Sequence, residues 1–184
     1  MNILDIKGYD RVNGPGIRMS IWTAGCNNHC KGCWAQHTWN PLQGRPTSEC
    51  MQEIEEILKT NDIDGVSILG GDPLFSTFNE GSSDDLIAII DLCKSYGKSV
   101  WVWSGYSLDD IYHTDKRVLE KIDVLVEGKY DESKRDLNLF YRGSSNQRVI
   151  FMEAPSDGVE YKHYVLSLLD DGYSLEECNG ESDK

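Results

Sequence analysis

The stretch IRMSIWTAGCNNHCKGCW, residues 17–34, joins a strand-like segment to a loop that carries three cysteines. Residues 17–24 are rich in β-branched and aromatic side chains, which favour a β-strand. Cys26, Cys30 and Cys33 follow in the spacing CxxxCxxC, and no fourth cysteine lies nearby. Parallel α/β folds place their sites at the carboxyl ends of the strands, so we expect a site in this loop.

Strand-like and helix-like segments alternate along the rest of the chain. The further strand-like segments are residues 66–69, 99–103, 123–126 and 148–152, and the helical patterns cover 47–58, 84–96 and, more weakly, 108–122 and 159–169. This alternation predicts βα units and an α/β fold with a mainly parallel sheet. An eight-unit barrel needs about 250 residues, so 184 residues predict an open, partial (β/α) barrel of about five or six βα units.

Length and composition predict one domain with a tail. The chain has 184 residues, enough for one core, and we expect a single domain over residues 1–169. Residues 170–184 contain six acids and little apolar content, which predicts an acidic, disordered tail.

The charge balance excludes some classes of partner. The net charge is −13, from 31 acidic and 18 basic residues, so we expect no nucleic-acid partner. The first residues lack the pattern of a signal peptide, and no apolar run approaches the roughly 18 residues of a membrane span. These features predict a cytoplasmic protein without a membrane partner. In a reducing compartment, clustered cysteines bind metal or do chemistry more often than they form disulfides.

Two kinds of metal site fit the cysteine spacing. A structural zinc site needs four protein ligands, and His37 is a candidate for the fourth, whereas His29 lies between two cysteines and would strain the loop. A 4Fe-4S cluster held by three cysteines keeps one iron open for a small molecule. Ligand softness favours the cluster, but the spacing alone leaves zinc open.

Six ordered segments resemble a known enzyme family. The cysteine motif and Gly70-Gly71-Asp72-Pro73 resemble the radical S-adenosylmethionine superfamily. The segment VNGPGIR, residues 12–18, is similar to the signature of its glycyl-radical-enzyme activating enzymes. Three more segments, 101–106, 124–130 and 141–147, narrow the resemblance to those that act on anaerobic ribonucleoside-triphosphate reductase. It covers residues 1–150.

The resemblance implies a fold, cofactors and partners. It implies a partial barrel of the radical S-adenosylmethionine type and a 4Fe-4S cluster held by Cys26, Cys30 and Cys33, with one non-cysteine iron site that binds S-adenosylmethionine. The implied activity is reductive cleavage of this cofactor and use of the 5′-deoxyadenosyl radical to generate a glycyl radical on the large subunit of the reductase. A flavodoxin-like or other one-electron donor is implied as a second partner, and a homodimer is left open.

The resemblance also assigns residues that bind S-adenosylmethionine. The expected residues are Gly32, Cys33, Trp34, Gly70, Gly71, Asp72, Pro73, Ser104, Glu127 and Lys129. Asp72 is expected to accept a hydrogen bond from the ligand's ammonium group, at a position where the wider superfamily usually carries glutamate. Many members have an aromatic residue at the position of Gly32, so we expect residues 32–34 to meet the adenine, with Trp34 stacking on it or packing under the loop.

Strand ends supply the remaining contacts. Ser104 is expected to bind the methionine carboxylate or the ribose, Glu127 the ribose hydroxyls or a cation, and Lys129 the carboxylate. Strand order predicts that all three share the rim of the cluster. Structural alternatives are an ordinary turn for GGDP and a solvated strand end for Lys129. Cys93 shares an apolar helical face and is expected to be buried rather than to bind metal.

Overall fold

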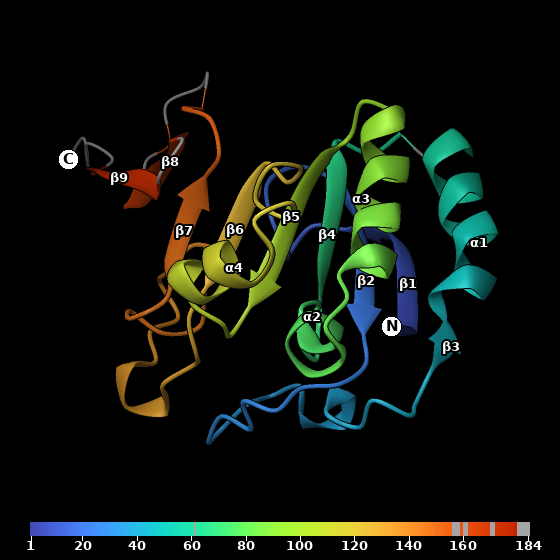
Figure 1. Cartoon of the computed structure of the whole chain (residues 1–184), viewed down its shortest axis with the longest axis horizontal. Helices are drawn as coiled ribbons and strands as arrows, with labels where there is room; N and C mark the ends of the chain where they lie inside the picture. The colour runs from blue at the N-terminus through green and yellow to red at the C-terminus, as the bar shows by residue number, and fades with distance from the viewer. Residues whose placement is uncertain (61, 156–158, 160–161, 170–171, 180–184) are drawn as a thin grey trace.

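The protein is described by a computed structural model that covers residues 1–60, 62–155, 159, 162–169 and 172–179. A single mixed sheet runs through the molecule, with α-helices along one of its faces (Figure 1). The strands are β1 (Asn2–Asp10), β2 (Arg18–Thr23), β3 (Arg45–Pro46), β4 (Gly65–Gly70), β5 (Ser99–Ser104), β6 (Val124–Glu127), β7 (Arg148–Phe151), β8 (His163–Leu169) and β9 (Gly172–Cys178). The α-helices are α1 (Thr47–Thr60), α2 (Phe75–Glu80), α3 (Asp84–Ser95) and α4 (Leu108–Asp115), and the 3-10 helices are Gln36–Thr38 and Glu132–Lys134.

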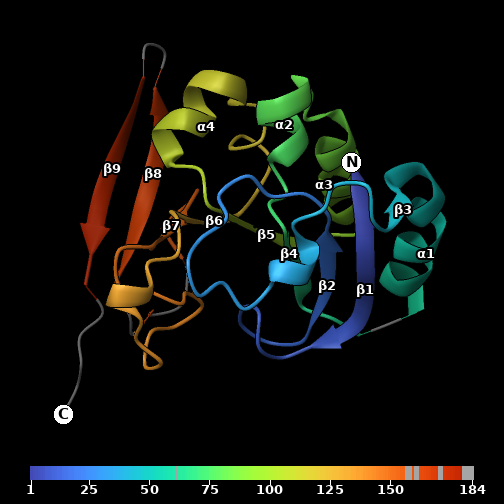
Figure 2. The same ribbon diagram turned by 90° about the horizontal axis from the view of Figure 1, so that it is seen from below.

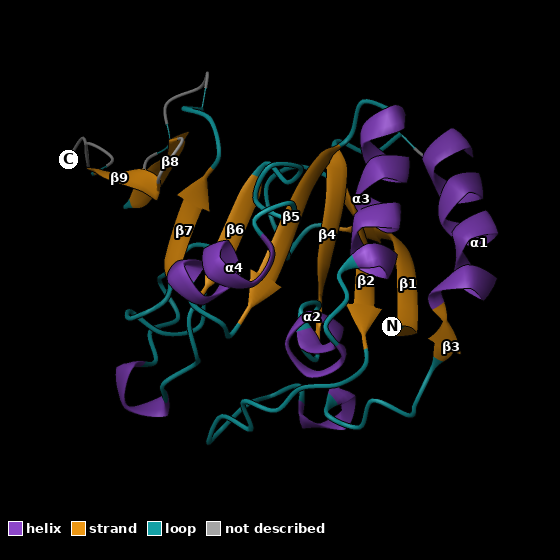
Figure 3. Ribbon diagram, viewed as in Figure 1, coloured by secondary structure: helices purple, strands orange, loops and turns teal. Residues whose placement is uncertain are grey.

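The centre of the sheet is parallel. The strand order is β3-β1-β2-β4-β5-β6-β7-β8-β9, and the central strands β2, β4, β5 and β6 pair with one another in parallel. Helices connect these four strands, as the alternation of segments predicts. β3 and β9 form the two edges, so the sheet is open (Figure 3).

The prediction of five or six βα units is wrong for the described residues, because the parallel run ends at β6. No helix crosses back between β6 and β7, and the loop that joins them stays at the carboxyl end of β6. β7 therefore returns antiparallel to β6. The outcome is a mixed α/β fold with four parallel central strands.

Two predictions near the C-terminus are also wrong. Residues 163–169, within the helix expected over 159–169, form β8 instead, because they pair in antiparallel register with β9. β9 occupies Gly172–Cys178, so this part of the expected tail is ordered by its hydrogen bonds to β8. Of the rest of the expected tail, only residue 179 is described; 170–171 and 180–184 lie outside the described residues.

The main core lies between the sheet and the helices. Met19, Ile21 and Ile68 from the sheet pack with Ile54 of α1 and Ile90 of α3, and all five are fully buried. Cys93 is part of this core, as expected, and burial raises the pKa of its thiol to about 12. Helix α3 ends at Ser95, one residue before the end of the pattern over 84–96, and Gly97 follows its cap with a φ of 67°, which suits glycine. No helix in the described part of the chain is long and apolar enough to cross a membrane.

Loops rather than α-helices cover the other face of the sheet. Trp22, Trp101 and Trp103 lie on this face, where Ala35 and Tyr141 from two loops pack against them. Figure 2 looks onto the edge where the parallel strands end, and there the cysteine loop and the β6–β7 loop lie side by side. The fold therefore brings two loops far apart in sequence to one rim.

Candidate functional site

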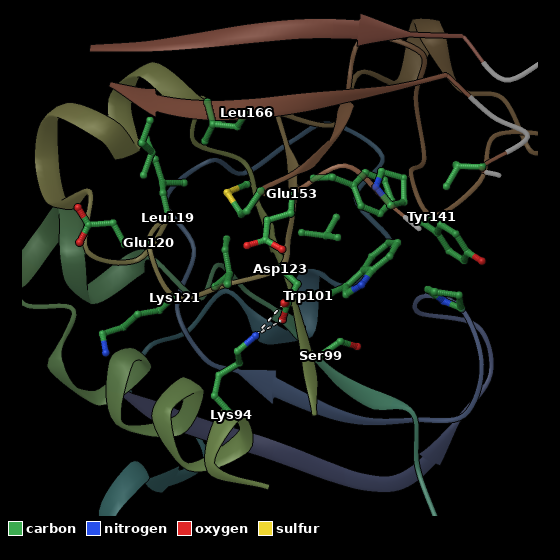
Figure 4. A pocket seen from close by; sticks show the side chains of 18 of the residues that line it. Lys94, Ser99, Trp101, Leu119, Glu120, Lys121, Asp123, Tyr141, Glu153 and Leu166 are labelled. Atoms are coloured by element: carbon green, nitrogen blue, oxygen red, sulfur yellow. Dashed lines mark hydrogen bonds and ion pairs between the residues drawn. The ribbon is translucent and has the colours of Figure 1, made fainter. Parts of the chain in front are cut away.

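A pocket of about 640 Å³ lies at the carboxyl ends of the parallel strands. Its lining includes Cys26, Cys30, Cys33, Gly32, Trp34, Gly70, Gly71, Asp72, Ser104, Gly105 and residues of the β6–β7 loop. The prediction that the cysteine loop and the ends of β4 and β5 meet at one rim is confirmed. A larger hollow at the amino ends of β5 and β6 includes the Lys94–Asp123 ion pair and no cysteine (Figure 4).

Backbone hydrogen bonds hold the cysteine loop in place. The amide of Gly25 donates to the Thr38 carbonyl at 2.8 Å, and the amide of Cys26 donates to the Trp39 carbonyl at 3.2 Å. The amide of Cys33 donates to the carbonyl of Cys30 at 3.1 Å, which closes a turn between these two cysteines. Cys26 is buried, while Cys30 and Cys33 are half-buried on the pocket wall. Backbone hydrogen bonds within the chain thus define the conformation of the cysteine loop.

The donor set fits an iron-sulfur cluster. Burial raises the pKa of the Cys26 and Cys30 thiols, an effect that bound metal would reverse by stabilising the thiolate. Among the residues that the structure describes, no three Cys, His, Asp or Glu side chains are placed to hold a single metal ion. In a 4Fe-4S cluster each cysteine thiolate binds a different iron, so the three thiolates need not meet at one metal ion. His29 instead packs against Trp39, with ring centroids 4.6 Å apart.

Gly70 and Gly71 let the end of β4 pack against the cysteine loop. Gly70 has a φ of 121°, and a Cβ there would lie 2.6 Å from the amide nitrogen of Thr23. A Cβ on Gly71 would lie 2.3 Å from the carbonyl oxygen of Gly25. The close approach allows the amide of Gly71 to donate to Thr23 and that of Asp72 to donate to Gly25. The absence of side chains on Gly70 and Gly71 therefore allows close backbone packing at the end of β4, and it would also let a ligand approach the backbone.

Asp72 is fully buried and receives four hydrogen bonds. Its Oδ1 accepts from Ser104 Oγ at 2.9 Å and from the Leu74 amide at 3.0 Å. Its Oδ2 accepts from the Gly105 amide at 2.9 Å and from Asn28 Nδ2 at 3.0 Å. Burial raises the pKa of Asp72 to about 6, and the four donors act against this shift. The carboxylate thus joins the cysteine loop to the ends of two strands.

Three of the expected ligand residues lie outside the pocket lining. Glu127 is 3% exposed and forms an ion pair with Arg148, whose Nε donates to its carboxylate. Lys129 is exposed and lines a neighbouring hollow with Lys31. It still lies near the cysteine loop, since its charge partly offsets the effect of burial on the Cys30 pKa. Pro73 is buried and is also absent from the lining.

Gly32 and Trp34 have clear local roles. Gly32 has a φ of 74°, a backbone conformation that favours glycine, and a Cβ there would lie 2.6 Å from Oε1 of Glu132, so a larger residue would displace that side chain. Trp34 is 75% exposed and meets Trp22 edge-on at 5.3 Å. It does not pack under the loop, and its ring stands at the mouth of the pocket.

The cysteine loop and the ends of β4 and β5 form two walls of the pocket, and the β6–β7 loop forms a third, most of which the sequence did not predict. Tyr130, Arg135, Leu137, Gly143 and Gln147 line it from the β6–β7 loop. No hydrophobic period marks this loop, and segments 124–130 and 141–147 indicated the family without assigning these residues to the pocket. Asn28 was missed for a similar reason, although its position between two cysteines was a usable hint.

Comparisons with known proteins agree on one family. A family model described as "4Fe-4S single cluster domain" matches residues 12–150. The anaerobic ribonucleoside-triphosphate reductase-activating protein of Escherichia coli K12 is 36% identical over 155 residues, which cover 81% of this chain and 97% of that protein. The proteins of the same name from Salmonella typhimurium and Enterobacteria phage T4 are 37% and 35% identical, over 76% and 89% of this chain and 92% and 99% of their own lengths. These relatives are matched over nearly their whole lengths.

Proposed function

This chain belongs to the anaerobic ribonucleoside-triphosphate reductase-activating proteins, which carry a 4Fe-4S cluster domain, and from this we propose the reaction that it performs. It cleaves S-adenosylmethionine reductively at the cluster and generates a glycyl radical on the large subunit of the anaerobic reductase. The observation that carries the proposal is the convergence of Cys26, Cys30 and Cys33 with the GGDP turn on one pocket. We assign the open sheet to the partial barrel of the radical S-adenosylmethionine superfamily.

The chain's own residues bind and orient the reactants. Cys26, Cys30 and Cys33 would hold three irons of the cluster through their thiolates. A bound cluster would supply the electron for reductive cleavage of S-adenosylmethionine, and the cofactor would supply the radical chemistry that acts on the α-carbon of the partner's glycine. Ser104 and the backbone of Gly70 and Gly71 line the wall on which the cofactor is oriented.

Lys129 and Glu127 lie outside the pocket lining, and only Lys129 keeps a proposed role in binding the cofactor. Lys129 attracts the carboxylate of S-adenosylmethionine as a point charge, a role supported by the effect of its charge on the nearby Cys30. Glu127 is left out of the proposed ligand contacts, because Arg148 already pairs with its buried carboxylate.

Exposed apolar side chains mark where the reductase enters. Val12, Trp34 and Leu137 are 78%, 75% and 82% exposed, and all three line the pocket from three different loops. Apolar groups gathered at a pocket mouth are typical of an interaction site. The glycine-bearing segment of the large subunit docks on this mouth and shields the radical from water. A flavodoxin-like protein or another one-electron donor reduces the cluster, in a reducing cytoplasm.

An anaerobic assay tests the proposed function. The protein is reconstituted with iron and sulfide, reduced chemically, and mixed with S-adenosylmethionine and the large subunit. We expect 5′-deoxyadenosine and methionine as products, and the doublet of a glycyl radical in the electron paramagnetic resonance spectrum. Cys30→Ala should abolish both. A colourless wild-type protein that binds one zinc ion would refute the proposal, and cleavage without any glycyl radical would assign the chemistry to another substrate.

A further inference from the structure

We propose that Asp72 and Asn28 are a positioning pair, in which the Asp72 carboxylate fixes the cysteine loop against the ends of β4 and β5 and does not receive the ammonium group of S-adenosylmethionine. The ligand named here rests on the proposed function. The positioning role itself rests on contacts within this chain. It departs from the expected role of Asp72 as a direct ligand contact.

All the acceptor positions of Asp72 are in use. A carboxylate offers about four lone-pair positions, two on each oxygen. Oδ1 receives the Ser104 hydroxyl and the Leu74 amide, and Oδ2 receives the Gly105 amide and the Asn28 side chain, all at 2.9 to 3.0 Å. A ligand ammonium would have to displace one of these donors. The displaced donor would then be left unpaired in a buried place, which is unfavourable.

The four donors come from three separate segments. Leu74 belongs to the turn that follows β4, Ser104 and Gly105 end β5, and Asn28 lies in the cysteine loop. Asp72 is 1% exposed, so water does not compete for these contacts. A single side chain therefore sets the spacing between the loop and both strand ends.

Asn28 is the member of the pair that reaches the cluster loop. It lies between Cys26 and Cys30, so its side chain fixes the middle of the segment that joins two thiolates. Gly105 makes room for it, since a Cβ there would lie 2.4 Å from Asn28 Nδ2. The length of aspartate suits these contacts, because one more methylene would move the carboxylate away from all four donors.

Binding of an analogue separates a positioning role from a direct contact. The anaerobic holoenzyme is titrated with S-adenosylmethionine and with the analogue that lacks the α-amino group, and the ratio of the two dissociation constants is compared between wild type and Asp72→Asn. A direct charge-assisted hydrogen bond is worth about tenfold or more, so its loss would shrink the ratio by about that factor. We expect the ratio to stay within about threefold of wild type, even if both affinities fall. A ratio that collapses would overturn the assignment.

Hydrogen exchange tests the pair without any ligand and without relying on Asp72→Asn to fold. We expect Asn28→Ala to raise amide exchange in residues 25–34 and at Gly105 by about tenfold or more, because the strand end and the loop lose their link. Asn27→Ala is the matched control, since the Asn27 side chain donates to the exposed Asn79 instead. Equal exchange in the two variants would overturn the positioning role. Wild-type protein that binds no S-adenosylmethionine would refute the proposed function, while the exchange result still decides the pair.

Discussion

Glu127 at the end of β6 forms a partly buried ion pair with Arg148 at the start of β7, and the two residues are also direct partners in the antiparallel register. The Glu127 side chain is 4% exposed, whereas that of Arg148 is 35% exposed. Arg148 also lies over the ring of Tyr164 in β8, 5.7 Å from its centroid. The pair thus anchors the strand at which the sheet changes from parallel to antiparallel.

Replacing Glu127 should lower stability more than replacing a surface acid. We expect Glu127→Gln to lower the free energy of unfolding by about 1–3 kcal/mol, because Arg148 keeps its charge and loses its charged partner. The partial exposure of Arg148 holds the loss below that of a fully buried pair. Denaturant unfolding measures the difference. The control is Glu120→Gln, which breaks an exposed pair with Lys116 and should change stability by less than about 1 kcal/mol. Equal losses in both variants would contradict the anchoring role.

The cysteines should divide into ligands and core residues. We expect alanine at Cys26, Cys30 or Cys33 to prevent assembly of the 4Fe-4S cluster, since a three-cysteine site has no spare thiolate. Cys93→Ala should keep the cluster and lower stability by about 1 kcal/mol, because it removes a buried sulfur from a packed core. Iron content and visible absorbance after anaerobic reconstitution distinguish the two groups. Loss of the cluster in Cys93→Ala would refute the ligand assignment.

Local patterns were enough to predict the central strands and two helices. Runs of β-branched residues mark β4 and β5, and the apolar period of α3 ends at Gly97. The two C-terminal strands, β8 and β9, were not predictable in this way. β8 has apolar residues at spacings that also fit a helix, and only pairing with β9 decides between the two. Pairing depends on a partner strand, which no single segment reveals.

The site was predictable where its chemistry has a fixed spacing. The CxxxCxxC motif and the GGDP turn placed two walls of the pocket at one rim, and the structure confirms their meeting. The hydrogen bond from Asn28 to Asp72 had no such signal, because polar contacts between loops follow no sequence period. Glu127 was expected to bind the ligand because binding residues often lie at strand ends. In the structure its carboxylate instead forms an ion pair with Arg148 on β7.

Gly71 should not tolerate a side chain. A Cβ there would lie 2.3 Å from the Gly25 carbonyl oxygen and 2.9 Å from that of Thr38, and both atoms belong to the backbone that holds the cysteine loop. We expect Gly71→Ala to lower stability by about 2 kcal/mol or more and to reduce cluster occupancy. Gly172→Ala is the control, since no heavy atom of the described residues beyond its chain neighbours lies within 4 Å of its Cβ position, and its effect should stay within about 0.5 kcal/mol. Unfolding curves and iron content of the two variants give the comparison.

Leu137 and Leu42 form a matched pair for testing where the reductase docks. Both are exposed leucines, at 82% and 87%, but only Leu137 lines the pocket. We expect Leu137→Glu to weaken binding of the large subunit by about tenfold or more, because it places a charge in a desolvated apolar contact. The yield of glycyl radical at a limiting concentration of the large subunit should fall together with the binding affinity. Iron content and unfolding should stay at the wild-type level, since the side chain supports no core.

Leu42→Glu adds the same charge away from the mouth, and titration of this variant with the large subunit should give the wild-type dissociation constant. Because the two substitutions change net charge equally, a general repulsion between an acidic chain and its partner would weaken both. Equal weakening would therefore move the docking surface away from Val12, Trp34 and Leu137. Weakening confined to Leu137→Glu would place the partner at the mouth of the cysteine pocket.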